Sequence, residues 1–199
     1  MDQHHAHTFE DPLEYLKGHN SNDALMALDK RILDFIEDQF REYKSKKFSV
    51  LDLGCGPGGL TPRVAERLSE IDGALYSVLG IDQSESFIAY AEENNSGKAV
   101  SYVCSDFLAH EFHQKKFSII FMVGVLHHAP KKVKNDWIRK LVGLLETDGI
   151  LLIGDTYKDA LHKQEEISIV EHSGMNLLDD ELLEVHHEKP MRLLSFHRS

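Results

Sequence analysis

The stretch from Ser49 to Gly59, SVLDLGCGPGG, constrains the fold of this chain more than any other part of its sequence. An apolar run typical of a buried strand ends there in four glycines and one proline, and a helix-like segment follows. Glycine permits positive φ angles and lets a ligand approach the main chain closely. A strand, a glycine-rich turn and a helix in this order predict a βα unit, with either a tight turn or a bound ligand as the reason for the glycines.

The rest of the chain alternates predicted strands and helices. Hydrophobic spacing predicts strands over 48–53, 76–81, 100–104, 117–123 and 150–153. Helices are predicted over 24–43, from the cap and first-turn proline at Thr61 and Pro62, from the cap Ser84, and over 131–146 and 161–172. Two more strands, 181–187 and 191–198, flank a predicted tight hairpin at EKP. This order predicts an α/β fold whose parallel βαβ units end in an antiparallel edge.

Composition narrows the class of protein. A chain of 199 residues with 42% hydrophobic and 28% charged residues fits one domain, 1–199, with a helical cap over 1–47 and a core over 48–199. The net charge of −11 disfavours nucleic acid as a partner. The sequence contains neither a signal-peptide pattern nor a run long enough to span a membrane, and its two cysteines fit a reducing compartment, so we expect a cytoplasmic protein. Its oligomeric state stays open.

Acidic residues near the strand ends limit the choice of ligand. Asp82 ends the second strand, where a carboxylate can accept hydrogen bonds from both ribose hydroxyls of a nucleoside. A dinucleotide and S-adenosylmethionine then compete, which makes an NAD-dependent oxidoreductase one alternative. Asp52, before the glycines, suits a ligand that carries an ammonium or sulfonium. Asp106 can accept the adenine amino group beside the apolar Phe107, and little chain remains for the second region that a dehydrogenase needs.

Together these motifs resemble those of class I S-adenosylmethionine-dependent methyltransferases, especially the small-methyltransferase group that includes quinone-biosynthesis enzymes. The resemblance is carried by VLDLGCGPGG, LGIDQSESFIAYAEEN, SDF, FSIIFMVGVLHHAP and LLETDGILLIGD, in that order, between Phe48 and Asp155. It implies a Rossmann-like, doubly wound sheet of seven strands in the order 3-2-1-4-5-7-6, mostly parallel, with strand 7 antiparallel. It also implies S-adenosylmethionine as cofactor and S-adenosylhomocysteine as product.

The resemblance assigns residues to the cofactor. It places the glycines of the loop at the methionine part, the acid after the second strand at the ribose, the Asp-Phe pair after the third strand at the adenine, and the end of the fourth strand along the cofactor. The cofactor-binding residues that we expect are Asp52, Gly54, Gly56, Asp82, Gln83, Asp106, Phe107 and Val123.

The catalytic prediction rests on two histidines after the fourth strand. Methyl transfer from a sulfonium is an in-line displacement that depends on alignment and, for some acceptors, on removal of a proton. His127 and His128 lie on the edge where substrate meets the methyl donor in this fold, and either can act as a base near neutral pH, with His127 ahead. Packing is the alternative role. Asp155, at the end of the fifth strand, is a second candidate at this edge, for which we expect a surface capping role.

Other histidines are candidate metal ligands. His110 and His113 have no acid or thiol at a suitable ligand spacing. We interpret the clusters His4-His5-x-His7 and His186-His187 as solvated positions, so no metal site is predicted. The sequence thus predicts a methyltransferase with a small-molecule acceptor and no membrane partner. The alternatives are a protein or RNA substrate, and a catalytically silent binding partner that shares the fold.

Overall fold

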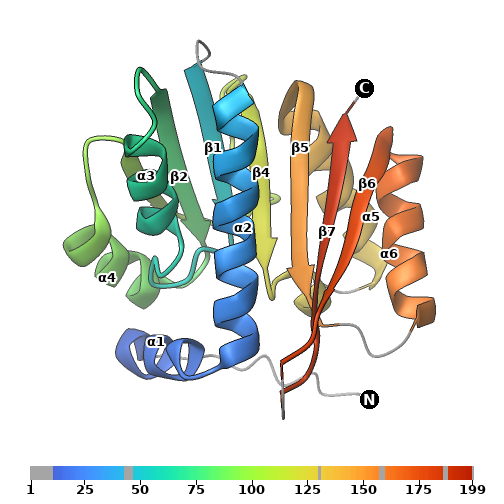
Figure 1. Ribbon diagram of the computed structural model, residues 1–199, viewed down its shortest axis with the longest axis horizontal. Helices are drawn as coiled ribbons and strands as arrows, with labels where there is room; N and C mark the ends of the chain where they lie inside the picture. Colours follow the sequence, from blue (N-terminus) through green and yellow to red (C-terminus); the bar gives the residue numbers. More distant parts are fainter. Residues whose placement is uncertain (1–10, 43–46, 130, 157–159, 186–187, 199) are drawn as a thin grey trace.

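The computed structural model describes residues 11–42, 47–129, 131–156, 160–185 and 188–198 (Figure 1). Its strands are β1 (Lys47–Leu53), β2 (Leu75–Asp82), β3 (Val100–Cys104), β4 (Phe117–Val123), β5 (Leu145–Asp155), β6 (Met175–Leu183) and β7 (Met191–Arg198). Its α-helices are α1 (Pro12–Asn20), α2 (Asp23–Glu42), α3 (Thr61–Ser69), α4 (Glu85–Asn95), α5 (Lys131–Leu144) and α6 (Ala160–His172). A short 3-10 helix, η1 (Leu126–His128), follows β4.

The strands form one seven-stranded sheet in the order β3-β2-β1-β4-β5-β7-β6. Neighbours from β3 to β5 pair in parallel, whereas β7 runs antiparallel to both β5 and β6. The predicted α/β fold class and strand order are therefore confirmed. Because the chain leaves β1 toward β2 on one side and returns as β4 on the other, the order reverses between β1 and β4. In open α/β sheets a ligand binds at such a reversal, outside the carboxyl ends of the strands.

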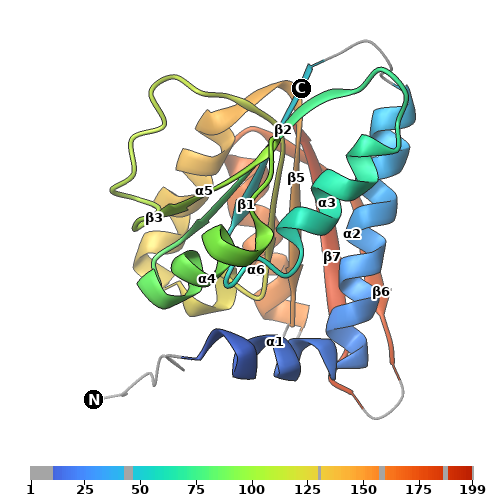
Figure 2. The same cartoon turned by 90° about the vertical axis from the view of Figure 1, so that its left-hand side faces the viewer.

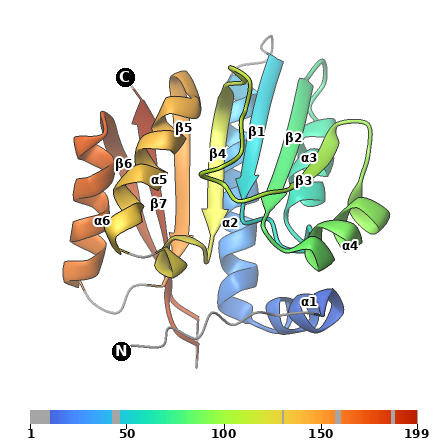
Figure 3. The same ribbon diagram turned by 180° about the vertical axis from the view of Figure 1, so that it is seen from behind.

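Helices cover both faces of the sheet (Figures 2 and 3). On one face, Leu28 and Ile32 of α2 and Val64 of α3 share a buried cluster with alternate strand residues. On the other face, Ile138 and Leu141 of α5 belong to a second cluster. Successive strand residues point to opposite faces, so the central strands are apolar on both sides. The parallel pairing of β1 with β4, from Val50 opposite Ile119 to Leu53 opposite Met122, brings the loops at their carboxyl ends side by side.

The carboxyl ends of β1, β2, β4 and β5 lie at one edge, where α1 crosses beneath β1 and β2 (Figures 1 and 3). The Asp11 side chain caps α1 by accepting from the backbone N–H groups of Leu13 and Glu14. Although α1 contains no fully buried residue, it packs against α2 and α4. It therefore lies over this edge as a cover.

Three local predictions are wrong. Thr61 is the first helical residue of α3, and the capping position falls on Leu60, which makes no side-chain cap bond. The helix predicted over 131–146 ends at Leu144, because β5 begins at Leu145 and runs to Asp155, well beyond the strand predicted over 150–153. The strand predicted over 181–187 begins at Met175 and ends at Leu183, so the connection to β7 is longer than a tight hairpin. The cap predicted at Ser84 is confirmed by the Phe87 N–H, which donates to Ser84 Oγ at 3.4 Å.

Candidate active site

The glycine loop after β1 is built from left-handed backbone. Gly54, Gly56 and Gly58 have φ angles of +72°, +54° and +80°, which residues other than glycine rarely adopt. The Gly54 N–H donates to the Ile81 carbonyl at 2.8 Å and ties the loop to the end of β2. A Cβ on Gly54 would lie 2.4 Å from Val125 Cγ2, so the space above this residue is already filled by the loop after β4. Glycine is therefore required here on two independent grounds.

Asp52 lies beneath this loop and is only 4% exposed. The Thr61 hydroxyl donates to Asp52 Oδ2 at 2.7 Å, which explains why Thr61 does not act as the helix cap. Burial raises the pKa of Asp52 to about 7, although the bond from Thr61 opposes this rise. The carboxyl group is thus poised to change its charge near neutral pH when a cation comes close.

Asp82 joins β2 to the glycine loop. Its Oδ2 accepts from the Gly56 N–H at 3.0 Å and its Oδ1 from the Ser84 N–H at 2.9 Å. Because the side chain remains half-buried, the lone pairs that these bonds leave over can still accept hydrogen bonds from a ligand. The next residue, Gln83, is exposed. The structure therefore brings Asp52, Asp82 and the loop together at the carboxyl ends of β1 and β2.

The residues predicted to frame an adenine divide between solvent and core. Asp106 is exposed after β3, and its Oδ1 accepts from the Ala109 N–H at 2.9 Å. Phe107 is 4% exposed, and its ring meets those of Phe112 and Trp137 edge-on. The Phe107 side chain thus packs into the core on the α5 face, and a direct contact with a ligand stays a prediction.

His127 lies at the neighbouring carboxyl edge, in η1. Its Nδ1 is 2.7 Å from Asp155 Oδ1, and its backbone N–H donates to Asp155 Oδ2 at 3.2 Å. The expectation of a surface capping role for Asp155 is wrong, because this residue is 2% exposed and binds the imidazole. The hydrogen bond that His127 donates to Asp155 raises the pKa of His127 above its usual range, although burial opposes the rise. The ring of His128 lies 3.9 Å from that of His127, measured between centroids.

Between the glycine loop and the His127–Asp155 pair, the backbone makes a short turn at the end of β4. Val123 is half-buried, and Gly124 follows with a φ of +65°. The Gly124 N–H donates to the Gly154 carbonyl at 2.8 Å, which holds the ends of β4 and β5 together. This turn places η1 and its two histidines beside the glycine loop.

Two further residues lie near the loop: Tyr15, which the family resemblance suggests as part of a lid over the cofactor, and Asp29, which no motif identifies. The Tyr15 ring on α1 would lie 3.4 Å from a Cβ on Gly56 and stacks obliquely at 5.2 Å from Phe87. Burial, together with the charges of nearby carboxylates, raises the pKa of Tyr15 to about 12. Asp29 on α2 is 1% exposed and binds His19 of α1 at 3.1 Å and Arg63 of α3 at 2.7 Å. An acidic residue next to the apolar stripe of a helix usually lies on the solvated face, so the sequence spacing does not predict that Asp29 is buried.

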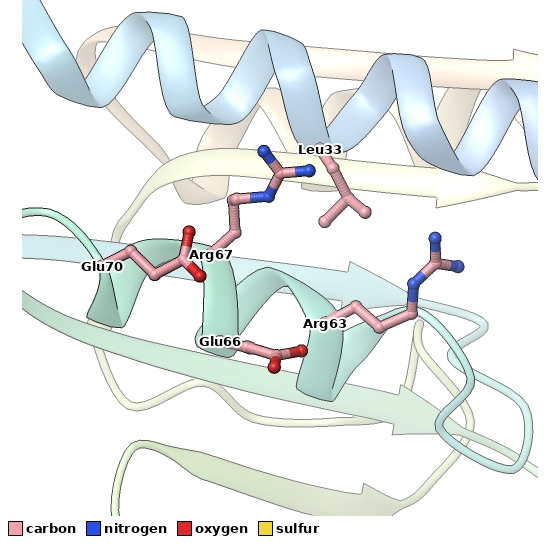
Figure 4. Close-up of a pocket in the computed structure, with 5 residues that line it drawn as sticks. All are labelled: Leu33, Arg63, Glu66, Arg67 and Glu70. Atoms are coloured by element: carbon pink, nitrogen blue, oxygen red, sulfur yellow. The ribbon is translucent and has the colours of Figure 1, made fainter.

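A hollow of about 270 Å³ lies between α2 and α3, lined by Leu33, Arg63, Glu66, Arg67 and Glu70 (Figure 4). Its arginines already pair with acids on α2: Arg67 Nη1 lies 2.5 Å from Glu37 Oε2, and Arg63 binds Asp29. The candidate site is therefore the carboxyl edge and not this hollow. In the described part of the chain, no group of three or more His, Cys, Asp or Glu side chains is arranged to hold a metal ion. The terminal cluster His4-His5-x-His7 and the pair His186-His187 lie outside the described residues.

The strand order and the loop after β1 define a class of protein, the class I methyltransferases. Residues 50–149 match the family described as a methyltransferase domain, and the chain belongs to that family. The narrower resemblance to quinone-biosynthesis enzymes stays a prediction. Within the described residues, no helix has the length and apolar character needed to cross a membrane.

Relatives within this fold carry different names. The chain is 25% identical over 142 residues to malonyl-[acyl-carrier protein] O-methyltransferase of Acetivibrio thermocellus, covering 70% of this chain and 46% of the relative. It is 30% identical over 145 residues to phosphoethanolamine N-methyltransferase of Plasmodium falciparum, covering 71% and 50%. The chain thus spans about half the length of these two curated relatives. Magnesium protoporphyrin IX methyltransferase from Synechocystis PCC 6803, a structure with bound S-adenosylmethionine, superposes with a TM-score of 0.70 at 18% identity, over 87% of this chain and 79% of that one.

Proposed function

We propose that this chain is an S-adenosylmethionine-dependent methyltransferase with a small-molecule acceptor. The observation that carries the proposal is the loop at the end of β1, where Gly54 and Gly56 adopt left-handed backbone and the Gly56 N–H holds Asp82 against the loop. We call this loop, together with Asp82, the cofactor cradle; a Cβ on Gly54 would overlap Val125 beside it. When bound, S-adenosylmethionine supplies an activated methyl group with a neutral thioether as leaving group.

Each residue of the cradle has a distinct task in this proposal. Asp82 accepts hydrogen bonds from the ribose hydroxyls, and the acid at Asp52 faces the positively charged part of the ligand. Tyr15 on α1 covers the loop and excludes water from it. The remaining predicted contacts, those of Gln83, Asp106, Phe107 and Val123, belong to the same proposal. Alignment of acceptor and methyl group within this enclosure supplies most of the rate.

The acceptor is a small molecule in this proposal because the net charge of −11 disfavours nucleic acid and one curated relative is named for a small acceptor, phosphoethanolamine. We also propose that residues 1–47 form a cap on a core of 48–199 within one domain. Cys55 and Cys104 are both free, which supports a cytoplasmic location.

Calorimetry with three ligands tests the proposal. S-adenosylmethionine and S-adenosylhomocysteine should bind the full chain with micromolar affinity, roughly −8 kcal/mol, and NAD should not bind comparably. Tight binding of NAD without a signal from S-adenosylmethionine would favour the oxidoreductase alternative. Binding of S-adenosylmethionine without release of S-adenosylhomocysteine for any acceptor would favour the silent binding partner.

A further inference from the structure

His127 and Asp155 form a pair in which hydrogen bonds from both side chain and main chain hold the carboxylate. Asp155 is 2% exposed at the end of β5, and its Oδ1 lies 2.7 Å from His127 Nδ1. The main chain holds the same carboxylate, because Oδ1 also accepts from the Thr156 N–H at 2.7 Å and Oδ2 from the His127 N–H at 3.2 Å. A buried carboxylate with these three donors has a fixed position and leaves the imidazole little choice of orientation.

This contact decides which ring nitrogen of His127 carries the proton. An ionised carboxylate only accepts hydrogen bonds, so the nitrogen that faces Asp155 must be protonated. In the neutral imidazole the proton therefore lies on Nδ1, and Nε2 has the free lone pair. The Asp155 contact thus prepares Nε2 as a proton acceptor.

The exposed imidazole lies next to Gly124, at the carboxyl end of β4. The His127 side chain is 43% exposed, whereas its partner Asp155 is almost fully buried. The ring atom Cε1, which is bonded to both ring nitrogens, lies 4.0 Å from the place of a Cβ on Gly124, at the end of β4. This is the strand end that the proposed function assigns to the cofactor, so an acceptor that meets the methyl group there also meets the His127 ring.

The charges around His127 favour its protonated form. Lys134 of α5 donates to Glu166 Oε1 of α6, so these two groups largely offset each other near the ring. Asp155 and Glu166 raise the pKa of His127, while Lys134 and burial lower it. Among the described side chains, His128 is a further titratable neighbour, with its ring 3.9 Å away between centroids. The balance is one net negative charge close to the imidazole, which stabilises an imidazolium once it forms.

We propose that His127 is the general base of the methyl transfer, that Asp155 is its positioning residue, and that the acceptor attacks through a nitrogen or oxygen that carries a proton. This inference rests on the proposed function. For a hydroxyl or ammonium acceptor, His127 Nε2 takes the proton and the electron pair of the broken O–H or N–H bond forms the bond to the methyl carbon. For a neutral amine, the nitrogen lone pair forms that bond and His127 Nε2 takes the proton from the resulting ammonium. The electron pair of the methyl–sulfur bond stays on sulfur, and His127 later returns the proton to water.

The acceptor class follows from the same charges. An ionised carboxylate has no proton to give up and would meet the negative charge of Asp155, so carboxylic acids gain nothing from this base. Amines, phenols and alcohols carry the proton that the base removes. The site is therefore specific for a neutral or cationic N–H or O–H acceptor.

The first experiment measures the tautomer and the pKa of His127 in the absence of any methyl acceptor. A nitrogen-detected NMR titration of the full chain should show the Nδ1–H tautomer of neutral His127 and a pKa above 6.5. In Asp155→Asn the pKa of His127 should fall, because the charged hydrogen-bond partner is lost. Asp148→Asn is the matched control, since Asp148 lies 3.8 Å from His197 Nε2 and is 68% exposed. An Nε2–H tautomer, or a His127 pKa that does not respond to Asp155→Asn, would overturn the proposal.

The second experiment measures release of S-adenosylhomocysteine with a panel of a primary amine, a phenol, an aliphatic alcohol and a carboxylic acid. Release with an N–H or O–H acceptor should fall about 10²–10⁴-fold in His127→Gln, with cofactor affinity unchanged. In Asp155→Asn the acid limb of the pH–rate profile should move to lower pH. His197→Gln should leave both the rate and the profile unchanged.

Three outcomes contradict this inference: release restricted to the carboxylic acid, release that His127→Gln leaves unchanged, and no release with any panel member although S-adenosylmethionine binds. Failure of S-adenosylmethionine to bind is seen by calorimetry before any acceptor is added, and it removes the proposed function itself. If Asp155→Asn does not fold, His127→Gln still decides the question, because its side chain is 43% exposed.

Discussion

The carboxyl edge of the sheet contains two neighbouring regions that are built in different ways. At the ends of β1 and β2, the proposed cofactor site rests on the main chain: positive φ angles at Gly54 and Gly56, and backbone N–H groups that hold Asp82. At the ends of β4 and β5 it rests on side chains from separate elements, above all His127 and Asp155. The first region needs glycines at fixed positions and therefore leaves a pattern in the sequence. The second is built from common polar residues, so the sequence marks His127 and Asp155 as separate candidates but does not show that they form a pair.

The largest effect is expected where the main chain itself is the recognition element. Gly54→Ala places a Cβ 2.4 Å from Val125 Cγ2 at a φ of +72°, so strain and overlap add, and the free energy of unfolding should fall by about 2–5 kcal/mol. Gly73→Ala is the control, because Gly73 has a φ of +74° with open space around it. It should cost about 1–2 kcal/mol in chemical denaturation, from strain alone. Equal losses in both variants would show that the contact with Val125 is irrelevant.

The same contrast explains how far the sequence predicts the fold. Strands β3 and β4 have the predicted bounds, since each is a short apolar run between clear turns. Strand β6 is shifted, because its sequence MNLLDDELL contains two adjacent acids and a register shift between Leu177 and Asp179. Asp180 can lie in a strand because Lys163 and Arg192 neutralise it from α6 and β7. Such partners are unknown before the fold is known, so the alternation of apolar and polar residues fails as a guide.

The candidate site follows the same rule. Motifs place Asp52, Gly54, Gly56 and Asp82 together, and the structure brings them together at one edge. Nothing in the sequence around Asp155 shows that it is buried or that it meets His127, which lies 28 positions earlier in the chain. The partners come from different strands, and only the parallel pairing of β4 with β5 aligns their ends. Long-range side-chain pairs of this kind require the tertiary structure.

A smaller effect is expected for the carboxylate that links the loop to β2. Asp82→Ala should weaken S-adenosylmethionine binding by about 1.5–3 kcal/mol, because a charged acceptor of ribose hydroxyls is lost. The variant also leaves the Gly56 and Ser84 N–H groups without this partner, so circular dichroism must accompany the calorimetry. Asp72→Ala, at an exposed acid before β2, is the control and should leave the affinity unchanged. An unchanged dissociation constant in folded Asp82→Ala would remove Asp82 from the site.

The smallest effect concerns Asp52, whose carboxyl group is buried beneath the loop and has a pKa of about 7, well above the ordinary 3.8. The folded state therefore holds a proton that the unfolded chain releases above pH 4, so the contribution of Asp52 to stability is complete at low pH and is lost as pH rises toward 7. Asp52→Asn removes this titration and keeps an oxygen for the Thr61 hydroxyl. Relative to Asp52→Asn, the wild type should lose about 1–2 kcal/mol of unfolding free energy between pH 5 and pH 7. Denaturation curves at several pH values measure this difference in unfolding free energy. A difference that stays constant from pH 5 to pH 7 would mean that Asp52 is already ionised in the folded protein, with its burial offset by other groups.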